Sequence, residues 1–491
     1  MQPVFLLTDL FVYAILLFVL WYIWHVRSDR NLKANWQLAM RRPVAMVSSL
    51  ILGFFLLVAL ADSFHYREAL PATEGKPVQY SSEANSLLDQ LLKPLATARE
   101  RSYSEPLSAV AFRKETFERD GVSVRDYPRL RFGGKHLTDP AKELSADVSA
   151  KTWSAIGLGL AIIASTLLLG LAVASIRCGQ SFGVSVARFK AGHTVWPWRS
   201  MALTFSVMVL AITWVVMLSQ GYHVFGTDRT GNSVLVFALK SVRTALVIGG
   251  LTTLVVLPLA LLLGVTAGYL RGWVDEVIQY IYTLLASIPD VLLIAASVLL
   301  LQVFIDKNQG FFDTSLERAD ARLFFLCLIL GITSFTGLCR LVRGETLKLR
   351  ELEYIQSARA FGVSTPRVLW RHIVPNLMHL VLINTVMQFS GFVLAEAVLS
   401  YVGVGVDPKT ASFGVMINTA RAELAATPLV WWSLTTAFGF MFLIVLSANL
   451  LSDAVRDAFD PRTRLRSGGS TSVPNASNAA NGKANTEEVA A

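Results

Sequence analysis

Charged side chains are scarce in this 491-residue chain, since Asp, Glu, Lys and Arg make up only 16% of it. Hydrophobic residues make up 53%, and the mean hydropathy is +0.51. Such a composition is too apolar for an ordinary soluble protein and predicts a polytopic membrane protein. The net charge of +9 then indicates cytoplasmic loops rich in Lys and Arg, and it does not indicate a nucleic-acid partner.

Cysteine and histidine are also scarce, with three and seven residues. Cys178, Cys327 and Cys339 lie in or beside apolar segments without the spacing of metal ligands, so we expect them to pack in the interior. The scattered histidines form no cluster with Asp and Glu at one membrane face, which argues against a membrane-embedded enzyme. We therefore expect no catalytic residue and no metal site in this chain.

The first apolar stretch, residues 4–24, lacks the pattern of a cleavable signal sequence. It is long enough to cross a membrane, charge follows it instead of preceding it, and no small-residue cleavage site is evident. We expect it to be a retained transmembrane helix.

Nine apolar segments come close to the ~20 residues that a helix needs to cross a membrane. They cover residues 3–25, 43–61, 153–176, 200–218, 238–269, 286–304, 322–340, 374–397 and 429–452. The loops 26–42, 176–199 and 341–373 are rich in Lys and Arg, which assigns them to the cytoplasm. One threading satisfies all three loops: an all-α polytopic membrane protein with about nine transmembrane helices, its N-terminus outside and its C-terminus inside.

The predicted spans divide the chain into five parts. Residues 1–61 and 153–221 hold two transmembrane helices each, and 222–463 form the largest part, called the core below. Residues 62–152 are long, charged and mixed in composition, which predicts a small extracytoplasmic domain, because loops beyond about 60 residues translocate regardless of their charge. Residues 464–491 are rich in Ser, Asn, Ala and Gly and are expected to form a disordered cytoplasmic tail.

The most informative segment is residues 354–376, a basic helix-turn-helix between two apolar stretches. Gly362 stands where a residue of positive φ commonly ends a helix, and Thr365 and Pro366 predict the cap and first turn of a second helix. Pro375 either ends that helix or joins it to the next span. The first helix is predicted from an apolar stripe formed by Leu352, Ile355, Ala358 and Phe361. From these residues alone, the loop is either a well-capped connector or a docking surface for a cytoplasmic partner.

This loop resembles the cytoplasmic loop of ATP-binding-cassette (ABC) importer permeases, whose motif runs Glu-Ala-Ala, three residues, Gly, nine residues, then Ile-x-Leu-Pro. Ala358, Gly362 and Pro375 fall in register with that motif. Four positions carry other residues than usual, namely Gln356, Ser357, His372 and Val374. Four further segments are similar to the oligopeptide and dipeptide branch of the family: HVFGTDRTGNSVL at 223–235, AGYLRGWVDE at 267–276, EAVLSYVGVGVDPKTASFGVMI at 396–417 and NLLSDAVRDAFDPR at 449–462. The resemblance covers about 222–463 and gives no account of residues 1–221.

The resemblance implies the permease subunit of an ATP-driven importer for peptides or peptide-like solutes, in the cytoplasmic (inner) membrane of a prokaryote. Its partners would be a second permease subunit, two ATPase subunits that bind ATP and Mg, an extracytoplasmic substrate-binding protein and membrane lipid. The chain itself would bind no cofactor, and the segment 226–233 has Asn232 where a phosphate loop carries Lys. The loop 345–375 would couple ATPase closure to alternating access. Its candidate residues are Gln356, Ser357, Ala358, Gly362 and Pro375.

The turn after the span 374–397 holds a second set of candidates. They are Glu396, Gly403, Gly405 and Asp407, which form either a solvated, capped loop or a contact for the binding protein.

Asp290 bears on the alternative to an ABC permease, an ion-coupled secondary transporter. It lies near the start of an apolar span and is either a helix N-cap at the interface or a functional intramembrane carboxylate. An ion-coupled transporter predicts several buried charges inside spans and often repeated halves. Asp290 is nearly alone in the predicted spans, and no repeat is visible.

Overall fold

The computed structural model describes residues 2–69, 80–119, 122–179, 181–192, 196–308, 310, 312 and 314–459. In these residues, eight helices are long and apolar enough to cross a membrane, and a bent helix pair raises the number of spans to as many as nine. The prediction of an all-α polytopic membrane protein is confirmed. The prediction of a disordered tail at 464–491 lies outside the described residues.

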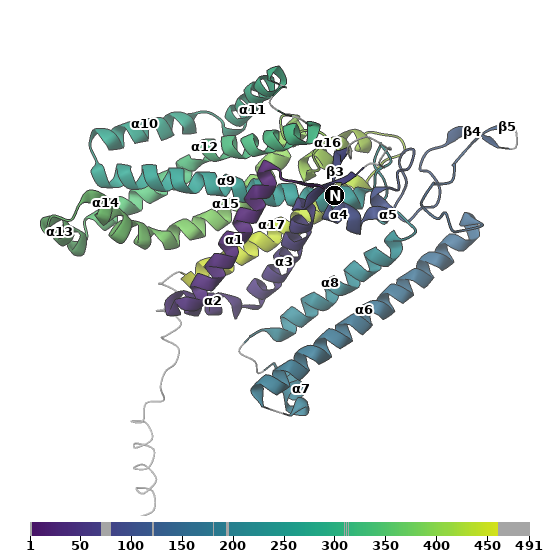
Figure 1. Cartoon of the computed structure of the whole chain (residues 1–491), viewed down its shortest axis with the longest axis horizontal. Coiled ribbons are helices and arrows are strands. Elements are labelled where there is room, and N and C mark those ends of the chain that lie inside the picture. The colour runs from purple at the N-terminus through teal and green to yellow at the C-terminus, as the bar shows by residue number, and fades with distance from the viewer. Residues whose placement is uncertain are drawn as a thin grey trace, which may run out of the picture.

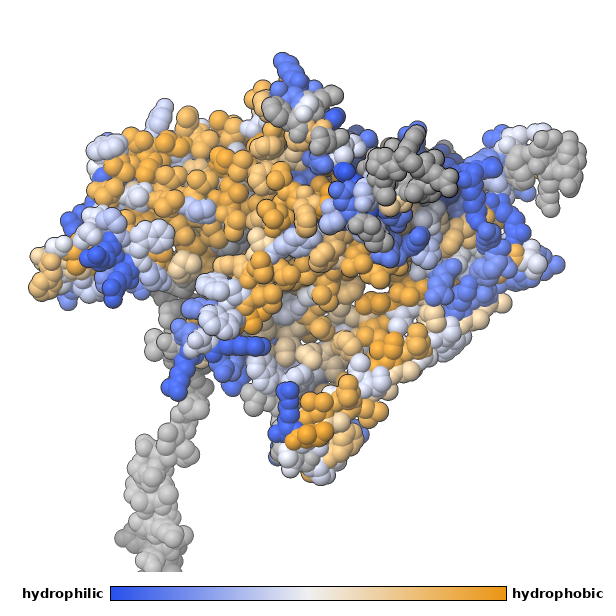
Figure 2. Space-filling model, in the orientation of Figure 1, coloured by the Kyte–Doolittle hydropathy of each residue, from blue (hydrophilic) through white to orange (hydrophobic). Residues whose placement is uncertain are grey.

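The spanning helices overlap the predicted segments, and most of their ends extend beyond them. They are α1 (Leu7–Ser28), α3 (Pro43–Ser63), α6 (Pro140–Cys178), α8 (Trp198–Ser219), α9 (Val234–Leu270), α12 (Ser315–Arg350), α15 (Val374–Val402) and α17 (Trp432–Phe459). Of these, α1 and α17 instead begin three to four residues inside their predicted segments. Apolar side chains cover these long helices, and hydrophilic side chains gather at their ends (Figure 2). This distribution is the one expected of helices embedded in lipid.

The predicted span 286–304 is replaced by a broken pair of helices. α10 (Trp273–Ser287) and α11 (Asp290–Lys307) meet at an angle of 90°. Ile288, between them, has an extended backbone with ψ of 134°, as expected before a proline. Pro289 therefore interrupts the helix. The second helix of the pair begins at Asp290, so the start predicted for this span, at 286, is wrong by about four residues.

The three loops predicted to be cytoplasmic lie toward one end of the molecule. They contain α2 (Arg30–Met40), α7 (Phe182–Ala191), α13 (Glu353–Ala360) and α14 (Thr365–Val368), at the left and bottom of Figure 1. At this end, Arg42 before α3 forms an ion pair with Asp457 near the end of α17. The placement agrees with the loop charges, and the assignment of this end to the cytoplasm stays a prediction.

The opposite end carries the strands and several short helices (Figure 1). β1 (Gln2–Val4), β2 (His65–Ala69) and β3 (Tyr80–Ser86) form an antiparallel sheet in that order, and β4 (Glu115–Arg119) pairs with β5 (Val122–Asp126). The short helices are α4 (Leu87–Leu91), α5 (Lys93–Ala96) and α16 (Phe413–Leu424). Because β1 pairs with β2, the residues before α1 are held beside those that follow α3.

The packing of α9 against α12 forms the centre of the core. A Cβ added to Gly264 would lie 2.8 Å from the carbonyl oxygen of Cys339, and one added to Gly268 would lie 2.7 Å from Cβ of Thr346. Small residues let helix backbones approach closely in membranes, so these glycines set the distance between the two helices. Cys327 and Cys339 are fully buried, which confirms their predicted role in packing; the side chain of Cys178 lies outside the described residues.

Candidate functional site

The loop between α12 and α15 consists of two short helices joined by a glycine turn. Gly362 has a φ of +77°, its N–H donates to the carbonyl of Arg359 at 3.0 Å, and the N–H of Val363 donates to Ala358 at 3.1 Å. This is the left-handed helix end predicted from the sequence, and glycine adopts it without the steric cost of a side chain. A Cβ added to Gly362 would meet no atom within 4 Å, so the backbone angle is the constraint, and not the space.

The second helix of the loop differs from the prediction at its start. Ser364, and not Thr365, occupies the N-cap position, so Thr365 and Pro366 are already helical. Proline is tolerated there because the N–H groups of the first turn have no acceptor within the helix. The helix continues through a π-helical turn, Leu369–Ile373, into α15. Pro375 therefore lies in the first turn of α15 and joins the loop to the span.

Three apolar side chains fix the loop to the spans. Ile355, Val368 and Ile373 are fully buried and belong to the same hydrophobic cluster as the side chains between α9 and α12. In the predicted apolar stripe, Ile355 is buried, but Leu352 is 42% and Phe361 is 87% exposed, so the stripe is wrong at both of its ends. The reason is that α13 runs only from Glu353 to Ala360, so neither Leu352 nor Phe361 follows the face of the helix.

Arginine side chains tie the loop and α12 to the turn between α9 and α10. Arg350 donates to the carbonyl oxygen of Tyr269 at 2.5 Å, and the guanidinium groups of Arg350 and Arg359 lie 5.6 and 5.8 Å from the centre of the Tyr269 ring. Arg343 donates two hydrogen bonds, of 2.6 and 2.7 Å, to Asp275 at the start of α10. Bidentate pairs of this kind fix geometry, so this pair sets the position of this end of α12 relative to α10.

The outer face of the loop presents aromatic and polar side chains to solvent. Phe361, Trp370 and Tyr354 are 87%, 66% and 45% exposed, and Gln356 and Ser357 are exposed beside them. At this tip, apolar surface adjoins hydrophilic surface (Figure 2). Aromatic side chains held on a rigid support are typical of protein interfaces. The geometry is therefore suited to binding another protein.

The turn between α15 and α16, at the opposite end, holds the second set of candidates. Glu396 is 2% exposed and accepts a hydrogen bond of 2.6 Å from Ser400. A Cβ added to Gly405 would lie 1.9 Å from the hydroxyl oxygen of Ser400, so only glycine fits there. Asp407 pairs with an arginine of α12 at 2.9 Å. The carboxylates of Glu396 and Asp407 thus stabilise the turn through contacts inside the protein. Contact of this turn with a partner stays a prediction, which rests on the exposed residue Gly403, where φ is +90°.

A buried polar cluster, which sequence reasoning did not predict, joins α1 and β2 to the core. Arg243 of α9 donates to Asp9 and, at 2.7 Å, to the hydroxyl of Thr8. Asp320 of α12 accepts from both the hydroxyl and the N–H of Thr8, the latter at 3.1 Å. His65 lies 2.8 Å from the other oxygen of Asp9. The cluster connects two helices of the core with residues outside it.

Asp290 is therefore not nearly alone as a charged residue in the spans, and the prediction is wrong on this point. Asp9 and Arg243 lie inside two predicted spans and form an ion pair. Their opposite charges, near the same end of the two spans, could have predicted this pair from the sequence. Asp290 itself is exposed and is the first residue of α11, preceded by Pro289 at the N-cap position. It is thus not the N-cap, and its charge lies in the first turn, where the helix dipole favours an anion.

Known proteins similar to this chain are transport permeases. Residues 260–465 match the family described as binding-protein-dependent transport system inner membrane component. The oligopeptide transport system permease protein OppC of Mycobacterium tuberculosis is 32% identical over 247 residues, which are 50% of this chain and 78% of that protein. The glutathione transport system permease protein GsiD of Pectobacterium atrosepticum is 32% identical over 242 residues, 49% of this chain and 73% of the relative. The dipeptide transport system permease protein DppC of Bacillus subtilis is 28% identical over 242 residues, again 49% of this chain and 69% of the relative.

Proposed function

This chain belongs to the family of binding-protein-dependent transport system inner membrane components, the permeases of ABC peptide importers, and we propose that it forms one transmembrane half of such an importer. Its solute would be a peptide or a peptide-like compound, as the names of the oligopeptide, dipeptide and glutathione permeases suggest. A second permease, two ATPase subunits and an extracytoplasmic binding protein would complete the importer in the cytoplasmic membrane of a prokaryote. ATP and Mg would bind to the ATPase subunits.

The loop between α12 and α15 carries this proposal. Phe361 and Trp370 project from it, whereas Ile355, Val368 and Ile373 lie in the hydrophobic cluster shared with the spans. An ATPase subunit that binds the exposed aromatic side chains would move the adjoining ends of α12 and α15, because the loop and the spans are packed in the same hydrophobic cluster. Closure of the ATPase pair on ATP would thereby change the access of the pathway from one side to the other.

An ion-coupled secondary transporter is not favoured. The similar proteins are permease subunits of transport systems, and the charges of Asp9 and Arg243, where α1 meets α9, pair with each other. This pair is satisfied within the protein, which is the arrangement expected of a structural joint.

Co-purification with the ATPase subunits of the importer tests the proposal. The double variant Phe361→Ala and Trp370→Ala should lose the ATPase subunits while it remains inserted at normal abundance, because buried aromatic anchors contribute most to such interfaces. Phe438→Ala is the matched control, since Phe438 is 59% exposed on the apolar surface of α17, and it should keep the ATPase subunits. Retention of the ATPase subunits by the double variant would refute a docking role for the loop.

A further inference from the structure

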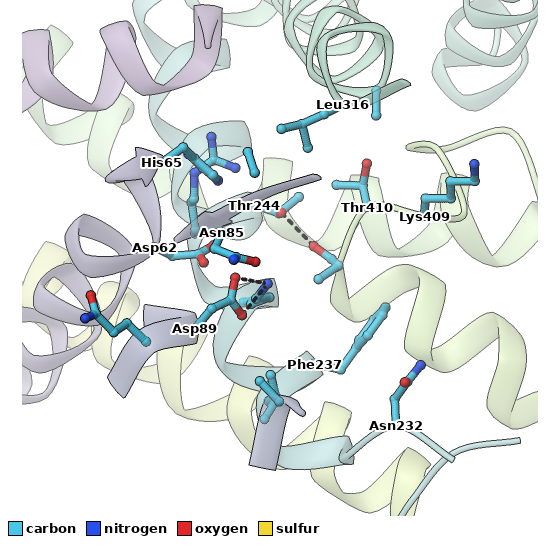
Figure 3. A pocket seen from close by; sticks show the side chains of 18 of the residues that line it. Asp62, His65, Asn85, Asp89, Asn232, Phe237, Thr244, Leu316, Lys409 and Thr410 are labelled. Atoms are coloured by element: carbon cyan, nitrogen blue, oxygen red, sulfur yellow. Dashed lines mark hydrogen bonds and ion pairs between the residues drawn. The ribbon is translucent and has the colours of Figure 1, made fainter. Parts of the chain in front are cut away.

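A cavity of about 840 Å³ lies between the N-terminal part of the chain and the core. Asp62, His65 and Asn85, from α3 and the strands after it, lie on one side of it, and Lys409 and Thr410, from the turn before α16, lie on the other (Figure 3). Cavities of a few hundred to a thousand Å³ are typical of small-molecule sites. The volume is sufficient for a short peptide.

Several charges in the walls of the cavity are already paired. Lys240 lies 2.7 Å from Asp89, and the pair is drawn in Figure 3. Arg243 and His65 both bind Asp9. These groups line the cavity, but their charges are already paired within the protein and are not expected to bind a ligand.

Two buried polar groups in the walls have no partner among the described residues. Asp62, in the last turn of α3, is 5% exposed, and no hydrogen bond or ion pair from the described part of the chain reaches its carboxylate. Ser233 is 4% exposed, and its hydroxyl likewise lacks a described partner. A largely buried carboxylate without a cation is unfavourable, so a cationic ligand at Asp62 would be stabilised there and would displace no cation of the described residues.

The opposite wall supplies a positive charge. Lys409 lines the cavity and is exposed to solvent, and its ammonium forms no ion pair with any residue that the structure describes. The lining also contains Glu68 and Lys93, one charge of each sign. Asp62 and Lys409 are the carboxylate and the ammonium that lie on opposite walls, and together they match a ligand with a positive and a negative end.

We propose that this cavity binds a zwitterionic solute, such as a short peptide, with its ammonium group at Asp62 and its carboxylate at Lys409. The inference rests on the proposed function and extends it by giving the permease a recognition site of its own, one wall of which lies outside the family match at 260–465. The hydroxyl of Ser233 adds a further hydrogen-bonding group to the lining. An organic ammonium is favoured over a metal ion, which needs several ligands, because the described residues contain no group of three or more His, Cys, Asp or Glu side chains able to hold one.

Calorimetric titration of the full chain in lipid nanodiscs with dialanine tests the inference. N-acetyl-dialanine lacks the ammonium and dialanine amide lacks the carboxylate, and each should bind the wild-type protein about tenfold or more weakly than dialanine, since each loses a charge-assisted hydrogen bond. In Asp62→Asn, dialanine and its acetylated form should bind equally. In Lys409→Gln, dialanine and its amide should bind equally. Asp126→Asn, which removes an exposed carboxylate on β5, should bind as the wild type does.

Two results would overturn the inference: equal binding or no binding of all three compounds by the wild-type protein, or an unchanged preference for the ammonium in Asp62→Asn. Lys409 is exposed, so Lys409→Gln provides a folded variant even if Asp62→Asn is poorly assembled. Uptake by the complete importer is measured separately. Dipeptide uptake combined with charge-independent binding to the isolated chain would refute the cavity as a site while leaving the proposed function in place. Retention of the ATPase subunits by the Phe361→Ala and Trp370→Ala double variant would count against the docking role of the loop and leave the cavity as a site.

Discussion

The main-chain N–H of Glu100 donates a hydrogen bond of 2.9 Å to the carbonyl oxygen of Gly231, and this contact joins the domain at 62–152 to the segment that leads into α9. One further bond crosses the joint, since the N–H of Ser104 donates to the hydroxyl of Thr227 at 2.7 Å. Within the core, the indole of Trp432 donates to the carbonyl oxygen of Thr227 at 3.0 Å and holds this residue in place. Residues 62–152 are therefore in direct contact with the core, beyond their covalent connection to it.

Gly231→Ala should loosen this joint. Gly231 has a φ of +80°, and a Cβ there would lie 2.0 Å from the carbonyl oxygen of Glu100. The backbone angle alone costs about 1–2 kcal/mol for a residue with a side chain, and the contact adds to that cost. We expect a lower unfolding temperature and faster proteolysis between the domain and the core. Gly53→Ala is the control, because Gly53 is helical with no atom within 4 Å of an added Cβ, and it should leave both measurements unchanged.

The carboxylate of Glu100 predicts a dependence of stability on pH. Burial alone would raise its pKa, but His223 at 3.5 Å and the N–H groups of Arg131, Phe132 and Gly133, at 2.7, 2.8 and 3.3 Å, outweigh burial and lower the pKa to about 2. Since the pKa is lower in the folded state than in the unfolded state, this stabilisation is complete above about pH 4.5 and disappears as the pH falls toward 2.

Comparison of the wild type with Glu100→Gln measures this contribution. The variant should unfold more easily at pH 7, by roughly 3 kcal/mol if the whole shift acts on stability, and the difference should shrink between pH 4.5 and pH 3. Thermal unfolding in detergent across this range provides the measurement. A difference that stays constant with pH would show that Glu100 acts through its shape and not through its charge.

Sequence patterns predicted the local features of this protein well, because their causes are local. The apolar runs predicted the spanning helices, and Gly362 was correctly placed as a left-handed helix end, since both depend on neighbouring residues. The amphipathic helix α10 was missed because its charged first turn, with Asp275 and Glu276, interrupts the apolar pattern. The Arg243–Asp9 pair joins residues 234 positions apart, and no periodicity contains information about such partners.

The orientation of the chain is tested by cysteine labelling in spheroplasts. Ser123→Cys on β5 and Ser364→Cys in the loop are both at exposed positions, in a background where Cys178 is replaced by serine. If the positive loops face the cytoplasm, a membrane-impermeant thiol reagent should label the first site in intact spheroplasts and the second only after permeabilisation. Cys327 and Cys339 should stay unlabelled, because both are buried. The reverse labelling pattern would contradict the predicted orientation.

Gly362→Val should uncouple ATP hydrolysis from transport. With φ at +77°, a side chain costs about 1–2 kcal/mol and a β-branched one more, which is enough to distort the turn between α13 and α14. The added atoms meet nothing within 4 Å, so the spans should insert and accumulate as in the wild type. Substrate uptake should be abolished, and substrate-stimulated ATPase activity of the reconstituted complex should fall. Gly344→Val is the matched control, since Gly344 lies in α12 near the same end with equally open space but ordinary helical backbone, and it should transport nearly normally. Wild-type uptake by Gly362→Val would show that the loop is only a connector, because a turn that transmits force cannot tolerate a change in its geometry.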